Sequence, residues 1–255
     1  MRHATVCAKI FNMQTSRQVR IVAGMCLATA ALLAQSGPRA AAKPEAPAGP
    51  APRTADGKAS LSGVWDIPYV PDMSRGAGAL PFTAWGEENW KGYDPAKYDY
   101  TAHCLPMGWT RQMNTPMPLE IMQEPNRVAI LFEAWQTFKV IPTDGRDHPK
   151  DVNPTWMGNS VGHWEGDTLV VDTIGFNDRT RLDTVGHPHS DQLHTIERLT
   201  RTDAMHITYE VTVDDPKTFT KPWSNKRTFT LKPDWELMEY SCEENNKDVG
   251  EGHVK

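Results

Sequence analysis

Hydrophobic and polar residues alternate along many short segments of the chain, and segments with a helical period are scarce. Alternation places successive side chains on opposite faces of a strand, so it predicts β-structure. Residues 68–118 are rich in Pro, Gly, Tyr and Trp and are expected to form a long loop region. The expected strands are residues 61–67, 119–123, 128–141, 161–164, 168–174, 194–201, 205–213, 226–231 and 237–242.

Short turns join these strands in pairs. The connections at residues 124–127, 165–167, 202–204 and 232–236 contain Pro, Gly, Asn or Asp, which favour tight turns, so four hairpins are expected. Eight or nine strands linked in this way predict an all-β fold, an antiparallel up-and-down barrel with room for one small ligand. A β-sandwich is the alternative, because turn spacing alone does not separate the two architectures.

The first 42 residues have the order of a secretory signal peptide. Arg17 and Arg20 precede an apolar run at residues 21–34, and small residues follow it. The run is too short to span a membrane, and an N-terminal anchor that is not cleaved is the alternative. Residues 43–58, rich in Pro and Ala, are predicted to be a linker, and residues 59–255 a single barrel domain. We therefore expect a periplasmic or secreted protein.

Removal of this leader changes the charge and the cysteine count. The chain has 27 basic and 32 acidic residues, and residues 1–42 hold five basic and no acidic ones, so the mature chain has a net charge of −10. Such a chain repels nucleic acid and anionic lipid, which leaves a small molecule as the expected partner. Cys104 and Cys242 remain, and an oxidising compartment favours a disulfide between them; two buried free thiols are the alternative.

Two resemblances support export and a β fold. The sequence Leu-x-Gly-x-Trp at residues 61–65 resembles the strand that opens lipocalin and related calycin barrels, where the tryptophan closes one end. The whole span of residues 61–247 resembles an exported bacterial protein family without established activity, which supplies no catalytic residues. That likeness is carried by Asp-Gly-Arg-x-His-Pro at 144–149, Gly-x-Trp-Glu-Gly-Asp-Thr-Leu-Val-Val-Asp-Thr-x-Gly-Phe at 162–176, Pro-His-Ser-x-x-Leu-His at 188–194 and Glu-Tyr-x-Cys-x-Glu-Asn at 239–245.

Polar residues that interrupt apolar strand faces are the candidates for chemistry. Glu133 interrupts a face of residues 128–141, Asp172 interrupts a face of residues 168–174, and His194 and Arg198 share a face with Ile196. If these faces point inward, the barrel holds acids, an imidazole and a guanidinium, as acid–base catalysis requires. A structural ion-pair network is the alternative. The expected catalytic residues are His194, Glu133, Asp172, Arg198 and His189.

Residues 186–198 hold three histidines, two acids and an arginine, which raises the question of metal binding. His187, His189 and His194 are the candidate ligands, but their spacing matches no helical zinc motif, so no cofactor is expected. Solvent-facing loop histidines are the alternative. The expected ligand-binding residues are Trp135, Trp164, Arg146 and Asp191.

Two functions follow from this sequence. The first is an exported enzyme that uses cofactor-free acid–base chemistry of the lyase, isomerase or hydratase type in a barrel cavity, with His194 as the base. The alternative is a periplasmic barrel that binds or carries a small ligand without catalysis. No phosphate loop, dinucleotide motif or haem-attachment motif is present in the sequence to fix a reaction.

Overall fold

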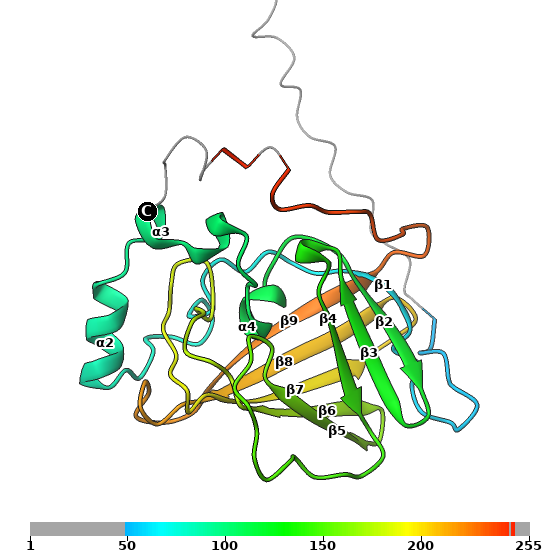
Figure 1. Cartoon of the computed structure of the whole chain (residues 1–255). Coiled ribbons are helices and arrows are strands. Elements are labelled where there is room, and N and C mark those ends of the chain that lie inside the picture. Colours follow the sequence, from blue (N-terminus) through cyan, green and yellow to red (C-terminus); the bar gives the residue numbers. More distant parts are fainter. Residues whose placement is uncertain (1–48, 245, 248–255) are drawn as a thin grey trace, which may run out of the picture. The chain divides into compact units, whose positions relative to one another are not determined.

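Nine antiparallel strands form a single sheet in the order β4-β3-β2-β1-β9-β8-β7-β6-β5. The sheet curls into a nearly closed up-and-down barrel, as Figure 1 shows, so the predicted barrel is confirmed over the β-sandwich. The computed structural model describes residues 49–244, 246 and 247, and the predicted signal peptide lies outside them. The strands are β1 (Gly63–Asp66), β2 (Leu119–Glu124), β3 (Arg127–Phe132), β4 (Phe138–Pro142), β5 (Asn159–Glu165), β6 (Thr168–Ile174), β7 (His194–Arg201), β8 (His206–Asp214) and β9 (Trp223–Leu231).

Three of the four expected hairpins are present, and the fourth is wrong. The pairs β2–β3, β5–β6 and β7–β8 meet across the predicted turns. In the turn between β5 and β6, Gly166 takes the left-handed conformation (φ 59°) that favours glycine. Residues 237–242 form no strand. The neighbour of β9 on that side is β1, since Trp65 pairs with Leu231, so the ladder position expected for residues 237–242 is already occupied.

The barrel closes between β4 and β5 by side chains. Within the described residues these two strands share no ladder of backbone hydrogen bonds. Lys139 on β4 crosses this seam and donates from Nζ to the carbonyl oxygen of Met157 at 2.6 Å. Gly162 on β5 lies so close to β4 that a Cβ there would come within 2.9 Å of the Ile141 Cγ2 atom. The missing side chain at Gly162 thus permits the close approach of the two strands.

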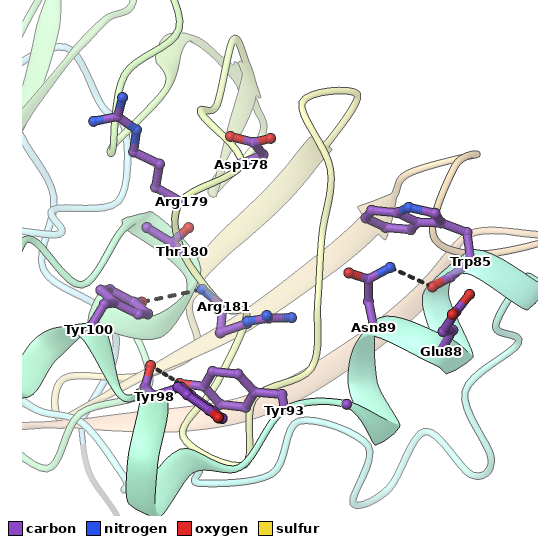
Figure 2. A pocket seen from close by; sticks show the side chains of 11 residues that line it. Trp85, Glu88, Asn89, Tyr93, Tyr98, Tyr100, Asp178, Arg179, Thr180 and Arg181 are labelled. Atoms are coloured by element: carbon purple, nitrogen blue, oxygen red, sulfur yellow. Dashed lines mark hydrogen bonds between the residues drawn. The ribbon is translucent and has the colours of Figure 1, made fainter. Parts of the chain in front are cut away.

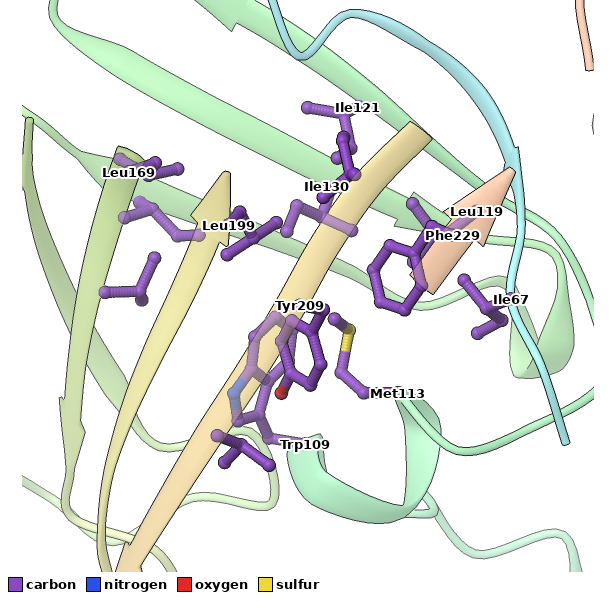
Figure 3. Packing of buried hydrophobic residues seen from close by; sticks show 14 of the residues in the cluster. Ile67, Trp109, Met113, Leu119, Ile121, Ile130, Leu169, Leu199, Tyr209 and Phe229 are labelled. Carbon is purple, nitrogen blue, oxygen red and sulfur yellow. The ribbon is translucent and has the colours of Figure 1, made fainter. Parts of the chain in front are cut away.

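The core fills the inside of the barrel. Burial alternates along β8, where Ile207, Tyr209, Val211 and Val213 face inward. Figure 3 shows such side chains packing with residues of the opposite strands, and Tyr209 stacks on Phe229 at 5.2 Å between ring centroids. Burial of each large apolar side chain stabilises the fold by roughly 1.5–3 kcal/mol.

Short helices occupy the predicted loop region and stand beside one end of the barrel (Figure 1). The longest begins where the Thr83 hydroxyl accepts a hydrogen bond from the Gly86 amide at 3.1 Å, an N-cap that satisfies a free donor of the first turn. Asp94 and Asp99 cap the next two helices in the same way. The helices of this region are α2 (Ala84–Lys91), α3 (Pro95–Tyr98), η1 (Tyr100–His103) and α4 (Trp109–Gln112), and a further short helix, η2 (Ala134–Gln136), lies between β3 and β4.

Part of the predicted linker packs on the barrel. Arg53 bonds the Asp167 carboxylate through Nη2 at 2.8 Å, and the Ala204 amide donates to the Gly49 carbonyl oxygen at 2.8 Å. These contacts extend the packed chain into the segment whose composition predicts a linker.

The predicted disulfide between Cys104 and Cys242 is present, across a sequence separation of 138 residues. It ties the segment that follows β9 to the residues just after η1. The segment between Leu231 and Cys242 is therefore fixed at both ends, although it belongs to no strand.

We predict that replacing both cysteines, Cys104→Ser with Cys242→Ser, lowers the free energy of unfolding by about 4–5 kcal/mol, because the unfolded chain then loses the constraint of a long closed loop. Urea unfolding of the variant and of the wild type, with and without reductant, measures the difference. Two free thiols in the unreduced mature wild type would contradict this prediction. Equal free energies of unfolding for the wild type and the double variant would also contradict it.

Candidate functional site

An open cleft of about 640 Å³ lies between helix α2, residues 93–100 and residues 178–181. Figure 2 shows its aromatic side chains on two sides and the side chain of Arg181 between them. The cleft lies on the helical side of the barrel, outside the packed interior. Its aromatic residues are Trp85, Tyr93, Tyr98 and Tyr100, and its polar residues are Glu88, Asn89, Asp178, Arg179, Thr180 and Arg181.

Hydrogen bonds fix the wall that carries Arg181. The Arg181 amide donates to the phenolic oxygen of Tyr100 at 3.3 Å, and the Tyr100 hydroxyl donates to the Met107 carbonyl oxygen at 2.6 Å. Thr180 is held from behind, with its hydroxyl 2.5 Å from His189 Nε2. The side chain of Arg181 is left to extend into the cleft (Figure 2).

The guanidinium of Arg181 is half-buried without a counter-charge. Its Cζ lies 4.3 Å from the centroid of the Tyr93 ring, and no carboxylate of the described residues lies within 4.0 Å of it. Burial lowers the pKa of Arg181 and raises the pKa of Tyr93 to about 12, so Tyr93 stays a neutral phenol. By contrast, the buried Arg111 makes two hydrogen bonds to Asp99, at 2.7 and 2.9 Å. Arg181 therefore lacks the partner that a buried cation normally has.

His189 lies behind this wall and does not reach the cleft. Its Nδ1 bonds the Ser190 carbonyl oxygen at 2.9 Å, so Nδ1 donates and Nε2 accepts from the Thr180 hydroxyl. Burial lowers the pKa of His189, which favours the neutral ring that this pattern requires. With both ring nitrogens occupied, His189 positions residue 180 and has no free nitrogen for proton transfer.

Asp172, His194 and Arg198 face outward, so the expected inward orientation is wrong. Burial on β7 falls on Thr195, Glu197, Leu199 and Arg201, the opposite face of the strand. The sequence pattern does not show which face of β7 is buried, because both faces of this strand mix polar and apolar residues. On the outer surface Arg198 pairs with Glu165 at 2.7 Å, an ordinary exposed ion pair.

Asp172 and His194 still meet, on the outer face of the barrel. The two oxygens of Asp172 bond His194 Nε2 at 3.0 Å and His148 Nε2 at 2.9 Å. His148 Nδ1 lies 2.9 Å from Asn159 Oδ1. One carboxylate thus orients two imidazoles, and a side chain from the 143–158 connection that the sequence did not single out completes the cluster.

Glu133 and Trp135 belong to a turn, because residues 128–141 form two strands and not one. Trp135 and Gln136 have positive φ values of 60° and 48°, which reverse the chain between β3 and β4. Glu133 is only 8% exposed and accepts a hydrogen bond from the Met238 amide at 2.9 Å. Since Glu133 and Trp135 lie in this turn and Asp172 lies on the outer face of β6, the expected interior set of acids is not formed.

The other expected ligand-binding residues have local partners away from the cleft. Arg146 bonds Asp144 through Nε at 2.9 Å, so it pairs within its own turn. Asp191 is exposed and lies 3.9 Å from Lys217. Trp164 is partly buried against the core.

The three candidate metal ligands do not come together, since His187, His189 and His194 belong to three separate hydrogen-bond networks. His187 instead lies with Asp72 and Asp183, whose candidate ligand atoms are within 4.8 Å of one another. Asp183 already accepts from the amides of Met73, Gly186 and His187 and from His187 Nδ1 at 2.6 Å. These four donors saturate the carboxylate, so the geometry favours a hydrogen-bonded dyad over a cation site.

Charged groups inside the barrel were missed by the sequence analysis. Trp109 donates from Nε1 to Glu197 at 2.8 Å and offers its ring to Lys139, whose Nζ lies 3.9 Å from the ring centroid. Burial lowers the pKa of Lys139 to about 7, with the Glu197 charge opposing this shift, and burial raises the pKa of Glu197. The indole therefore links an amine and a carboxyl that the strands place in the core. The only sequence signal was a polar residue within an alternating strand, which is also common on surfaces.

Comparison of the chain with protein-family models, curated proteins and solved structures finds no match. Of the helices in the described part of the chain, none has the length and apolar character needed to cross a membrane.

We predict that Lys139 makes the free energy of unfolding rise with pH. The unfolded chain holds the Lys139 proton up to about 10.5 and the folded chain only to about 7, so the unfolded state binds more protons between these values. The free energy of unfolding of the wild type minus that of Lys139→Met should therefore increase with pH. Between about pH 8 and about pH 10 we expect an increase of roughly 1 kcal/mol per pH unit.

Chemical denaturation at several pH values measures this rise, and the exposed Lys226→Met variant is the control. A constant difference for Lys139→Met across this range would show that the amine is not desolvated.

Proposed function

We propose that this protein binds a small aromatic monocarboxylate in the cleft that contains Arg181. The unpaired, half-buried guanidinium of Arg181 carries the proposal. A guanidinium binds a carboxylate through two parallel hydrogen bonds, and a bound carboxylate would supply the counter-charge that the described residues do not.

The other lining residues narrow the ligand class. Trp85 lies on the side of the cleft opposite Tyr93, whose ring packs against the Arg181 guanidinium, and these aromatic walls suit a planar aromatic ligand (Figure 2). Glu88 and Asp178 also line the cleft and repel a second negative charge. Asn89 donates to the Trp85 carbonyl oxygen at 2.8 Å, which leaves its side-chain oxygen as an acceptor. A ligand with one carboxylate and one hydroxyl donor on an aromatic ring matches this arrangement.

Binding is favoured over catalysis in a barrel cavity by the placement of the expected catalytic residues. Glu133, His189 and Asp172 lie in separate surroundings, and core side chains fill the barrel. A base, its acid partner and a substrate position within hydrogen-bond reach are the minimum for acid–base chemistry. The cleft supplies a ligand position without such a pair.

We also propose that the chain is exported to the periplasm or secreted, as a lipocalin-like member of the exported bacterial family that it resembles. The support is the leader-like order of residues 1–42 and the Cys104–Cys242 disulfide, which persists in oxidising compartments. The net negative charge of the mature chain supports a small-molecule partner over nucleic acid.

We predict that Arg181→Gln weakens binding of 4-hydroxybenzoate by about tenfold or more, because it removes a charged, two-point contact from a partly desolvated position. Isothermal titration calorimetry measures the affinity. Arg179→Gln is the matched control, since Arg179 lines the same cleft but is exposed, and its loss should change affinity by less than about threefold. 4-Hydroxybenzyl alcohol lacks the carboxylate, so it should bind the wild type weakly. Its affinity for the wild type should not exceed the affinity of Arg181→Gln for 4-hydroxybenzoate. Equal affinity of wild type and Arg181→Gln would exclude this role for Arg181.

A second candidate function is acid–base catalysis at the outer cluster of His148, Asp172 and His194. The observation that favours it is a carboxylate that orients two partly exposed imidazoles, the arrangement of a base with its orienting group. In this case His194→Ala should remove turnover of a substrate while the barrel stays folded, as circular dichroism would check. A folded His194→Ala variant with unchanged turnover would exclude His194 as the base.

A further inference from the structure

A second hollow lies at the end of the β3–β4 hairpin, against residues 233–238. It has two parts, of about 560 and about 390 Å³, and both are lined by Glu133 and Met238. The larger part extends between Pro116–Pro118 and Asp234–Glu236, and the smaller part extends over the outer face of β3 and β4. We call the two parts together the Glu133 groove.

Glu133 provides a buried charge in this groove. Its side chain is more than nine-tenths buried, and Oε2 accepts one hydrogen bond, from the Met238 amide at 2.9 Å. Among the residues that the structure describes, no lysine, arginine or histidine nitrogen lies within 4.0 Å of this carboxylate. A single backbone donor does not compensate the burial of a carboxylate, which normally has a cation or several donors.

The walls of the groove are apolar and open to solvent. Phe138 is 69% exposed, Met238 70% and Trp235 45%, although such side chains are usually covered. The backbone around them is fixed: Trp135 stacks on Tyr240 at 5.1 Å between ring centroids, and Glu133 holds the Met238 amide. The apolar surface is therefore part of a formed hollow and not of a free chain end.

The charges that line the groove have one sign. Asp234 and Glu236 line the larger part together with Glu133, and neither part is lined by a lysine or an arginine. Lys232 lies 5.2 Å from the Trp235 ring centroid, and its Nζ is 3.4 Å from Asp66, so it has its own acid partner. Three acids beside an apolar wall attract a cation that also carries apolar surface.

We propose that the Glu133 groove is a binding site for small apolar ammonium compounds, with the ammonium on the Glu133 carboxylate and the apolar part against Phe138 and Met238. The site is independent of the cleft of Arg181, because the two share no lining residue and the groups proposed to hold the ligands, Glu133 and Arg181, have opposite charge. The ammonium group of the ligand would supply the positive charge that the described residues do not place beside Glu133, and it would donate a charge-assisted hydrogen bond to the carboxylate.

The test uses the folded mature protein and 2-phenylethylamine as the probe, with binding measured by isothermal titration calorimetry and by chemical shifts in NMR spectra. We expect saturable binding with one equivalent, and at least tenfold weaker binding of 2-phenylethanol, the neutral analogue. Glu133→Gln should weaken binding of 2-phenylethylamine by tenfold or more, because the glutamine keeps an acceptor for the Met238 amide but removes the negative charge. Glu210→Gln, which changes a partly exposed acid on the outer face of β8, is the matched control and should leave the affinity unchanged.

A second variant protects the test against misfolding of the first. Phe138→Ser removes an exposed apolar wall on which the core does not depend. It should weaken binding of 2-phenylethylamine severalfold, while the ratio of the dissociation constants of 2-phenylethanol and 2-phenylethylamine stays the same. Arg181→Gln should not change amine binding, which separates this proposal from the proposal for the cleft. No saturable binding of the amine, or equal affinities for wild type, Glu133→Gln and Phe138→Ser, would overturn the proposal.

Discussion

The pairing of β1 with β9 is the constraint on which the rest of the structure depends. It joins a sheet of four strands, β1 to β4, to a sheet of five, β5 to β9, and so makes one barrel from two consecutive meanders. Because β1 occupies the free edge of β9, the chain after Leu231 cannot continue the sheet. It runs instead past Glu133 toward Cys104, where the disulfide holds it, and this path forms one wall of the Glu133 groove.

Buried polar groups in this protein are mostly paired with groups that are distant in the sequence. Glu197 on β7 is matched by Trp109 from α4, and Asp183 is matched by the amide of Met73. Each such pair fixes a helical or loop segment onto the barrel, and it does so with a direction that apolar packing alone does not supply. Arg181 has no acid partner among the described residues, and Glu133 accepts a single hydrogen bond, from the Met238 amide. Each of the two lines a hollow, which is why they are the positions where we expect ligands.

Much of the barrel could be predicted from the sequence, because turn residues and alternation are local signals. The hairpins β2–β3, β5–β6 and β7–β8 follow directly from them. The inward face of β7 could not be predicted, since the choice between His194 and Thr195 depends on Trp109 and Lys139, which come from other segments. The β1–β9 closure is equally non-local, so the local pattern of residues 237–242 and the turn signal at 232–236 predict a strand that the closed sheet leaves no place for.

The candidate site was harder to predict than the fold for the same reason. The cleft brings residues 85–100 together with residues 178–181, and the first of these segments has no period from which a structure could be derived. In the sequence Arg181 resembles Arg146 or Arg198. The difference is that Arg146 and Arg198 have carboxylates beside them in space and Arg181 does not.

The seam between β4 and β5 has a consequence for solubility. Each strand has an edge whose backbone amides and carbonyls are not used in a ladder, and such edges are templates for the addition of foreign strands. In the closed barrel the two edges shield each other, with Gly162 against Ile141 and Lys139 bonded to Met157. Separation of the seam would expose both edges at once, and it would break side-chain contacts without first breaking a ladder of backbone hydrogen bonds. The protection of this barrel against self-association therefore rests on a few side chains and one glycine along a single line of its surface.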